Sequence, residues 1–285
     1  MRADFDGHRD VWGPLLTIQL RSWAEMFFKP VAQLRASGLF QPATLGPDPP
    51  PGPTPGLGVR FSSGTPEINL LDPQPTDHER MHHFDLAAEE YVSAVGSFTG
   101  PVLGEVLRLL DRDLPADARL LDVSCGPGDE AVQLASLVPA GEVVAVDLSV
   151  PTLREAFRIA GESGTPNVVF HQCDAEVLRG DWDGAFDIVV CALSLHFYDD
   201  ARAAVKGFHR VLRPGGRVYV AEPGTSWLND LSAPLVRMAN PALVRYRSAD
   251  ELRQLFDEVG FGPSQWSEVL PGIGVLVAPR EGGPS

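Results

Sequence analysis

The chain has 285 residues, of which 44% are hydrophobic, and its formal net charge is −15. The length suffices for one α/β domain with an additional segment, and no apolar run reaches the roughly 18 residues of a membrane-spanning helix. The acidic balance without a Lys/Arg cluster argues against nucleic acid, which proteins bind through basic patches, so we expect a small or uncharged substrate and no membrane partner.

The start of the chain is acidic and lacks the basic-then-apolar order of a secretion signal, so we expect a cytoplasmic protein. The three cysteines, Cys125, Cys173 and Cys191, lie in or beside apolar runs without CxxC or Cys/His spacing. Buried thiols explain them better than disulfides or a metal site, and we expect no metal.

The first 75 residues divide into two predicted zones. Residues 1–41 carry apolar side chains at three- and four-residue spacing, which predicts a helical N-terminal extension. Residues 42–75 begin with a run rich in proline and glycine and are expected to form a linker and loop. Within them, Val59–Phe61 could be a short strand.

Residues 76–285 show the regular alternation of a folded domain. Helical segments are expected from Thr76 or Asp77 to Leu110. The strands that follow are predicted at Arg119–Ser124, Glu142–Asp147, Asn167–His171, Phe186–Ala192, Gly216–Glu222, Gln265–Leu270 and Gly272–Val277. Helices are predicted at Asp129–Leu137, from Val150 or Pro151 to Gly161, from about Asp199 to Leu212, and at Ala249–Val259.

This alternation predicts an α/β fold with a doubly wound seven-stranded sheet. Strands that alternate with helices pair in parallel through right-handed crossovers. The continuous apolar runs VVAVD and FDIVVCAL are typical of strands that are buried on both faces. The last two strands meet at Pro271-Gly272, where a tight turn predicts an antiparallel hairpin at the C-terminal end.

The first predicted strand of this domain runs into a glycine turn, LLDVSCGPGD. Gly126 and Gly128 allow the backbone to turn sharply and to approach a ligand closely. Asp147 ends the next strand about 20 residues later, where a carboxylate can accept both hydroxyls of a ribose. Asp174 follows the third strand and can accept the amino group of an adenine, or it can cap the next helix.

In this order and spacing, residues 80–280 resemble class I S-adenosylmethionine (SAM)-dependent methyltransferases, particularly the small-molecule enzymes of the ubiquinone/menaquinone type. The resemblance is carried by FDLAAEEY, LLDVSCGPGDEA, VVAVDLS, HQCDAE, FDIVVCALSLHFYDD and RVLRPGGRVYVAEPG. It implies a Rossmann-like fold and SAM as cofactor. Ser124 replaces the usual glycine of the turn, which could shift the approach to the methionine part slightly.

The resemblance also implies which residues contact the cofactor. They are Tyr91, Asp122, Ser124, Cys125, Gly126, Gly128, Asp147, Leu148, Cys173, Asp174, Ala175, Cys191 and Ala192. For Asp122 the contact would be with the amino group of SAM, and a structural bond to the neighbouring turn is the alternative. Tyr91 could equally be a core residue.

A nicotinamide cofactor is the main alternative, because the turn also satisfies GxGxxA and Asp147 suits the ribose of NAD equally well. Three features favour SAM: Asp122 before the turn, Asp174 after the third strand, and the closing antiparallel hairpin.

Methyl transfer from SAM needs alignment and water exclusion, and a base where the acceptor is a phenol, enol or amine. The candidate bases are His196, Glu222, His82 and His83, each of which could instead be structural. The insertion at 223–247 is the expected lid; Trp227, Leu231, Leu235, Met238 and Leu243 would make it apolar. The acceptor is therefore expected to be a hydrophobic or aromatic metabolite.

Two questions stay open in the sequence. The fold could bind SAM and catalyse a non-methylating reaction, such as a pericyclic one, instead of methyl transfer. The aromatic segment Trp23–Phe28 could serve the acceptor pocket or a homodimer contact.

Overall fold

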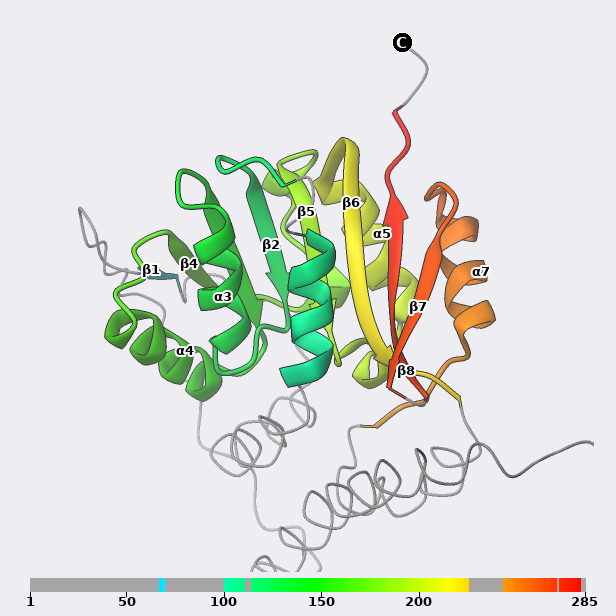
Figure 1. The fold of residues 1–285 in the computed structure, drawn as a ribbon, viewed down its shortest axis with the longest axis horizontal. Helices are drawn as coiled ribbons and strands as arrows, with labels where there is room; N and C mark the ends of the chain where they lie inside the picture. Colours follow the sequence, from blue (N-terminus) through cyan, green and yellow to red (C-terminus); the bar gives the residue numbers. More distant parts are fainter. Residues whose placement is uncertain (1–66, 70–99, 111–113, 226–242, 271, 283–285) are drawn as a thin grey trace, which may run out of the picture.

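The structure is a computed structural model that describes residues 67–69, 100–110, 114–225, 243–270 and 272–282. They form an eight-stranded sheet in the order β1-β4-β3-β2-β5-β6-β8-β7, which Figure 1 shows as a twisted layer with helices packed against it. The predicted α/β fold with seven strands and a closing hairpin is confirmed. The predicted N-terminal helical extension lies outside the described residues.

An additional strand, β1 (Glu67–Asn69), pairs in parallel with β4 (Val168–Gln172) at one edge of the sheet. These residues were expected to be part of a loop, and that prediction was wrong. The strand has three residues and adds only edge pairing, so its sequence carries too little alternation to reveal it.

The other elements match the predicted order closely. The remaining strands are β2 (Arg119–Val123), β3 (Glu142–Asp147), β5 (Phe186–Ala192), β6 (Leu212–Pro223), β7 (Gln265–Leu270) and β8 (Ile273–Pro279). The α-helices are α3 (Asp129–Leu137), α4 (Val150–Glu162), α5 (Ala201–Val211) and α7 (Ala249–Val259). Helical backbone also covers residues 100–110, and short 3₁₀ helices occur at η1 (Ala175–Val177), η2 (Gly180–Trp182) and η3 (Leu195–Phe197).

The strand order places a reversal point beside β2. The chain runs outward from β2 through β3 and β4 on one side, and through β5 and β6 on the other, all in parallel. The hairpin of β7 and β8 is antiparallel and attaches through β8 to β6. In open α/β sheets, ligands bind outside the carboxyl ends of the strands at such a reversal point, so the loops after β2, β3 and β5 are the place to look for the site.

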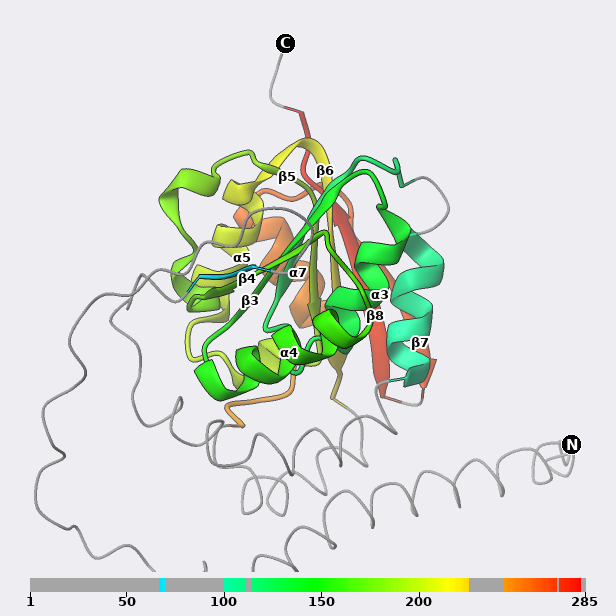
Figure 2. The same ribbon diagram turned by 90° about the vertical axis from the view of Figure 1, so that its left-hand side faces the viewer.

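Each central strand feeds two hydrophobic cores, one on each face of the sheet. Leu121 and Val123 belong to the core under α5 and α7, whereas Leu120 belongs to the core under α3, α4 and the 100–110 helix. This alternation follows from the two-residue period of a strand. Figure 2 shows helices on both faces of the sheet, and the double coverage explains why these strands are almost entirely apolar.

Side-chain caps fix where the helices begin. The hydroxyl of Ser149 accepts a hydrogen bond from Thr152 N at the start of α4, and the Asp200 carboxylate accepts one from Ala203 N at the start of α5. At α7, Ser248 and Glu251 form a reciprocal capping box. These caps hold α4 and α5 against the strand ends that carry the candidate site.

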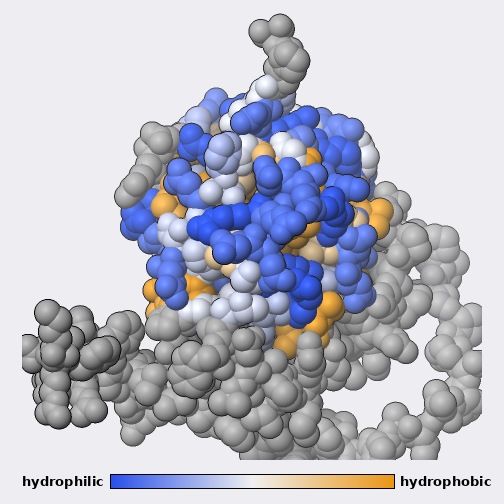
Figure 3. All heavy atoms as spheres, turned by 90° about the vertical axis from the view of Figure 1, so that its right-hand side faces the viewer, coloured by the Kyte–Doolittle hydropathy of each residue, from blue (hydrophilic) through white to orange (hydrophobic). Residues whose placement is uncertain are grey.

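The edge strand β7 has mostly exposed or half-exposed residues, and Figure 3 shows that this end of the molecule is largely hydrophilic. A polar edge discourages pairing with a strand of another molecule.

Among the described residues, the structure contains no helix that is both long and apolar enough to cross a bilayer.

Candidate functional site

The predicted cofactor residues in the described part of the chain lie in β2, β3 and β5 or in the loops that leave β2 to β5. The candidate bases His196 and Glu222 lie at the same edge of the sheet, in η3 and near the end of β6. Three predicted residues, His82, His83 and Tyr91, fall outside the described residues, so their roles stay predictions.

The glycine turn after β2 adopts the backbone that the sequence predicted. Gly126 and Gly128 have φ angles of 54° and 90°, in the left-handed region that glycine enters without strain. A Cβ on Gly128 would lie 2.7 Å from the Cβ of Ala156, so glycine allows α3 to start directly against α4. A Cβ on Gly126 would meet nothing within 4 Å, which leaves open space beside the turn.

The Asp147 carboxylate holds this turn to the start of α4. Its Oδ2 accepts a hydrogen bond from Gly126 N at 3.0 Å, and its Oδ1 accepts one from Ser149 N at 2.9 Å. Each carboxylate oxygen can accept more than one hydrogen bond, so these contacts are compatible with a further donor from a ligand. Asp147 therefore has a structural role that the sequence did not indicate, in addition to the predicted one toward a ribose.

Asp122, near the carboxyl end of the central strand β2, is fully buried, and neither of its carboxyl oxygens has a hydrogen-bond partner. Oε1 of Glu130, in the first turn of α3, is also buried without a partner. The alternative that Asp122 makes a structural bond to the turn is therefore wrong. Buried polar groups are nearly always paired in folded proteins, so three such carboxyl oxygens beside one turn indicate a site for a ligand.

Burial and mutual repulsion raise the pKa values of both carboxyl groups. The pKa of Asp122 is raised well above its usual range by burial first, then by the negative charges of Glu130 and Asp147. Burial raises the pKa of Glu130 from 4.5 to about 7. Both groups therefore hold protons more tightly in the folded protein than in the unfolded chain.

This difference predicts how the cofactor-free protein responds to pH. A raised folded-state pKa contributes stability below the unfolded value, and that contribution is lost as pH rises through the folded value, here from about 4.5 to about 7 for Glu130. Glu130→Gln cannot ionise, so it should lose less stability over this range. We expect the cofactor-free variant to melt about 2–4 °C above the wild type near pH 8, a difference of roughly 1 kcal/mol, and to melt close to it near pH 5.

Thermal unfolding at both pH values checks this expectation. The matched control is Asp129→Asn, because Asp129 is the exposed neighbour of Glu130 in the same helical turn. A destabilised Glu130→Gln protein at the higher pH would contradict the assignment of a charge penalty to this position.

The loop after β4 carries the residues that were predicted to contact an adenine. The Asp174 carboxylate accepts a hydrogen bond from Glu176 N at 2.9 Å and caps η1, which is the role left open beside adenine binding. Cys173 N donates to Asp147 O at 3.0 Å, which fixes this loop to the end of β3. Ala175 is buried, and Leu148 is half-buried with its carbonyl bonded to Gln172.

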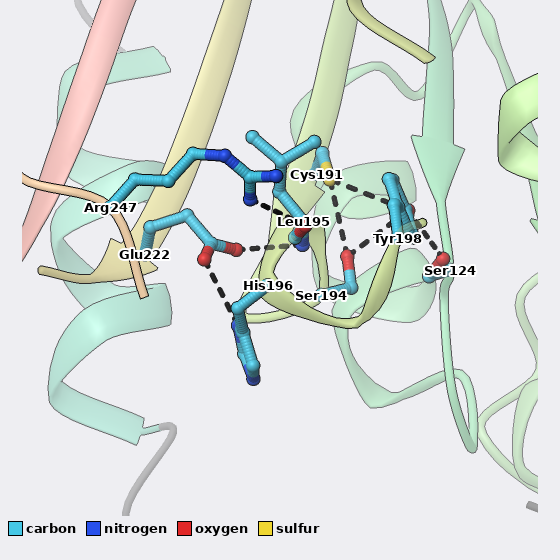
Figure 4. Close-up of polar contacts among 8 residues, drawn as sticks. All are labelled: Ser124, Cys191, Ser194, Leu195, His196, Tyr198, Glu222 and Arg247. Carbon is cyan, nitrogen blue, oxygen red and sulfur yellow. Dashed lines mark hydrogen bonds and ion pairs between the residues drawn. The ribbon is translucent and has the colours of Figure 1, made fainter. Parts of the chain in front are cut away.

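A hydroxyl network joins the loops after β2 and β5, as Figure 4 shows. Ser124 has a left-handed φ of 58°, and its Oγ lies 2.7 Å from the hydroxyl of Tyr198. That hydroxyl lies 3.3 Å from Oγ of Ser194, which in turn contacts Sγ of Cys191 at 3.1 Å. The bond to Tyr198 gives a physical reason for a serine at a position whose backbone favours glycine.

The side chains of His196 and Glu222 form a buried pair, with exposed fractions of 7% and 3% for the two residues. His196 Nδ1 lies 2.9 Å from Oε2 of Glu222, and Oε1 of Glu222 accepts a hydrogen bond from Leu195 N at 2.7 Å. The carboxylate therefore orients the imidazole and leaves its second nitrogen, Nε2, on the far side of the ring (Figure 4). Such a pair can act as a general base.

Residues 243–247 hold the backbone and ring of His196 in place. The amides of Val244 and Arg245 both donate to His196 O, at 3.1 and 3.3 Å. The ring of Tyr246 packs at 5.7 Å from the imidazole centroid, and Arg247 donates to Leu195 O at 3.2 Å. The C-terminal end of the predicted lid segment thus contacts the candidate base, while residues 226–242 lie outside the described residues.

Leu243, which was expected to line the lid, is buried in the core on the face of the sheet that carries α5 and α7. Two other predicted cofactor residues, Cys125 and Cys191, are buried in the described domain, and Ala192 is half-buried at the end of β5. Burial raises the pKa of the Cys191 thiol to about 12, so this group is neutral.

The sequence reasoning missed Glu130, Ser194 and Tyr198. All three lie within the motifs already quoted, but none was singled out. Ser124 was the available signal for Tyr198, because a serine at a glycine position calls for a compensating partner. The acidic first turn of α3, directly after the glycines, was the signal for Glu130.

Residues 120–216 match the family described as a methyltransferase domain. The chain is 32% identical over 158 residues to the uncharacterized methyltransferase YcgJ of Bacillus subtilis, covering 54% of this chain and 61% of that protein. It is also 32% identical over 174 residues to the 27-O-demethylrifamycin SV methyltransferase of Amycolatopsis mediterranei, covering 57% and 62%. These alignments span about three fifths of each relative.

Solved structures give the same fold. The crystal structure of YcgJ aligns with a TM-score of 0.53 at 29% identity and covers 58% of this chain and 70% of that one. The [4+2]-cyclase SpnF aligns with a TM-score of 0.59 at 21% identity, over 76% of this chain and 100% of that one, which shows a shared fold alone.

Proposed function

We propose that this chain, in which residues 120–216 are a class I SAM-dependent methyltransferase domain of the ubiquinone/menaquinone type, methylates a small apolar or aromatic metabolite. One observation carries the proposal. The same edge of the sheet holds a glycine turn beside the unpartnered carboxyl group of Asp122 and a buried His196–Glu222 pair.

The residues at the turn fit SAM. Open space beside Gly126 admits a ligand close to the backbone, and the unpartnered carboxyl group of Asp122 would pair, once ionised, with an ammonium or sulfonium group of the ligand. Asp147 lies at the end of the neighbouring strand, where its carboxylate would accept the ribose hydroxyls. Asp174 and Ala175 would line the adenine side.

When bound, SAM supplies an activated methyl group on its sulfonium. The protein then has to align the acceptor, exclude water and take up a proton where the acceptor is a phenol, enol or amine. Glu222 holds His196 Nδ1, so Nε2 is the nitrogen that would accept this proton. The positive charge that develops on the imidazole would be stabilised by the adjacent carboxylate.

The acceptor class rests on the named relatives and on the aromatic rings beside His196. The curated relatives are named for demethylmenaquinone, ubiquinone and 27-O-demethylrifamycin SV, all of them small molecules. The rings of Phe197 and Tyr246 flank the His196 imidazole, which suits an aromatic or apolar acceptor. We also propose that the domain boundaries lie at residues 41 and 75, that the protein is cytoplasmic, and that it forms a homodimer.

The direct test is incubation with methyl-labelled SAM and a panel of phenolic, polyketide and prenyl acceptors. Label that moves to an acceptor supports methyl transfer. Label that stays on SAM across the whole panel would overturn methyl transfer and favour the non-methylating alternative. Calorimetry with S-adenosylhomocysteine (SAH) and NADH tests the cofactor separately, and tight binding of NADH alone would overturn the proposal.

A further inference from the structure

Among the described residues, two that are not glycine have left-handed backbone, Ser124 with a φ of 58° and Leu193 with a φ of 53°. An L-amino acid is strained in this conformation, and such strain persists only where the surrounding contacts hold it. Ser124 directly follows β2, and Leu193 directly follows β5. The two strained positions therefore lie in the two loops that meet in the hydroxyl network of Figure 4.

A short hydrogen bond between Ser124 Oγ and the Tyr198 hydroxyl, at 2.7 Å, joins these loops. The Tyr198 side chain is buried, and burial raises the pKa of its hydroxyl well above the usual range. The phenol therefore stays protonated, so it serves as a hydrogen-bonding group and not as a base.

Tyr198 also ends η3, the short helix that carries His196. Its backbone N–H donates to Leu195 O at 3.3 Å. On the other side of η3, Leu195 N donates to Glu222, whose second carboxylate oxygen contacts His196 Nδ1. Figure 4 shows η3 held between Glu222 on the side of β6 and Tyr198 on the side of β2.

The residues after Tyr198 are held by a third element. The Glu176 carboxylate accepts hydrogen bonds from Asp199 N at 3.0 Å and from Asp200 N at 3.1 Å, which fixes the start of α5 to η1. Neither Glu176 nor Glu222 connects this loop to the turn after β2. The bond from Tyr198 to Ser124 does.

We propose that Tyr198 is a positioning residue, which fixes His196 relative to the bound cofactor through its hydrogen bond to Ser124. The inference rests on the proposed function, in which the turn holds the methyl donor and His196 takes up the proton of the acceptor. Misalignment of such groups lowers the rate of a transfer step. Asp147 holds the turn independently, so loss of the Tyr198 hydroxyl should affect kcat more than cofactor binding.

A double-mutant cycle tests this role. Ser124→Gly and Tyr198→Phe each remove one hydroxyl of the bond, and kcat is measured at saturating SAM and acceptor. We expect a roughly tenfold loss of kcat in each single variant and no further loss in the double variant, because the second change removes a bond that is already broken. The dissociation constant of SAH should change by less than about threefold in all three variants.

Ser124→Gly separates positioning from folding. Glycine adopts this backbone without strain, which offsets the lost hydrogen bond, so the melting temperature should stay within about 2 °C of the wild type. The matched control is Tyr219→Phe. It removes the hydroxyl of a buried tyrosine on β6 that belongs to the core on the opposite face from that of Tyr198, so kcat should stay unchanged.

A second readout needs neither ligand nor acceptor. The imidazole NMR signals of His196, assigned by comparison with His196→Ala, report the surroundings of the ring. We expect Ser124→Gly, Tyr198→Phe and the double variant to move these signals to similar positions, and Tyr219→Phe to leave them in place.

The outcomes separate the inference from the function beneath it. Wild-type kcat in either single variant, losses that multiply in the double variant, or unmoved His196 signals would each overturn the inference while the proposed function stands. If the wild type transfers label to no acceptor of the panel, the proposed function fails and the inference fails with it.

Discussion

Asp147→Ala is expected to weaken the binding of SAM and of SAH by roughly 100-fold or more, the largest change in affinity that we predict. The variant loses the carboxylate that accepts from Gly126 N and Ser149 N, so the turn loses its tie to α4. It also loses the predicted acceptor for the ribose hydroxyls. Hydrogen bonds to a charged group contribute about 1.5–3 kcal/mol each, and the loss of two or more accounts for this size.

Calorimetry with both ligands measures the effect, and circular dichroism checks that the variant is folded. The control is Glu142→Gln at the other end of β3, where the carboxylate pairs with Arg119 far from the turn and affinity should stay unchanged. Asp147→Asn keeps one carbonyl oxygen as an acceptor, so it should give an intermediate loss. A folded Asp147→Ala protein with wild-type affinity would overturn the assignment of this edge as the cofactor site.

His196→Ala should lower kcat for methyl transfer by about 10²- to 10⁴-fold, the usual range for loss of a general base, with the dissociation constant of SAM unchanged. The reason is that His196 lies in the loop after β5 and touches Glu222 rather than the glycine turn. Glu222→Gln should show the same split with a smaller loss, because the amide still fills the space but cannot stabilise a charged imidazole.

Two further measurements distinguish a base from a structural histidine. Added imidazole should partly restore the rate of His196→Ala, and the loss should shrink with acceptors that ionise more readily. His209→Gln is the control. His209 lies on α5 and packs against Phe261, so its substitution should leave the rate unchanged. Equal loss with every acceptor and no rescue would show that His196 only holds the loop.

Much of the fold could be predicted because local patterns and the tertiary structure agree. The helix Asp129–Leu137 and the strands Glu142–Asp147 and Phe186–Ala192 have the bounds that were expected. Their ends are marked by glycine turns, caps and changes in apolar period, which are local signals. Strand β6 begins four residues earlier than expected, at Leu212, because it pairs with Phe186 ahead of a bulge.

The site was less predictable, because its key contacts join distant parts of the chain. Ser124 and Tyr198 are 74 positions apart, and no local pattern indicates that they meet. The bonds from Gly126 and Ser149 to Asp147 depend on how two loops are placed by the sheet. Residue types and strand ends predict which groups gather at one edge, but partners and burial follow only from the packed structure.

The unpaired carboxyl group of Asp122 also affects the stability of the folded protein. A buried carboxyl group without a partner is costly, and Asp122 lies beside the turn in that state. The cofactor-free fold is therefore less stable than it could be, and a ligand that pairs with this carboxyl group should raise the melting temperature of the protein.

The short strand β1 bears on where the chain can be cut. Because Glu67–Asn69 pairs with β4, a shortened protein starting at residue 76 would leave the backbone groups of Val169 and His171 facing solvent at the rim of the sheet. An unpaired sheet edge can pair with a strand of a neighbouring molecule. Such a protein would therefore tend to self-associate although its methyltransferase motifs were intact.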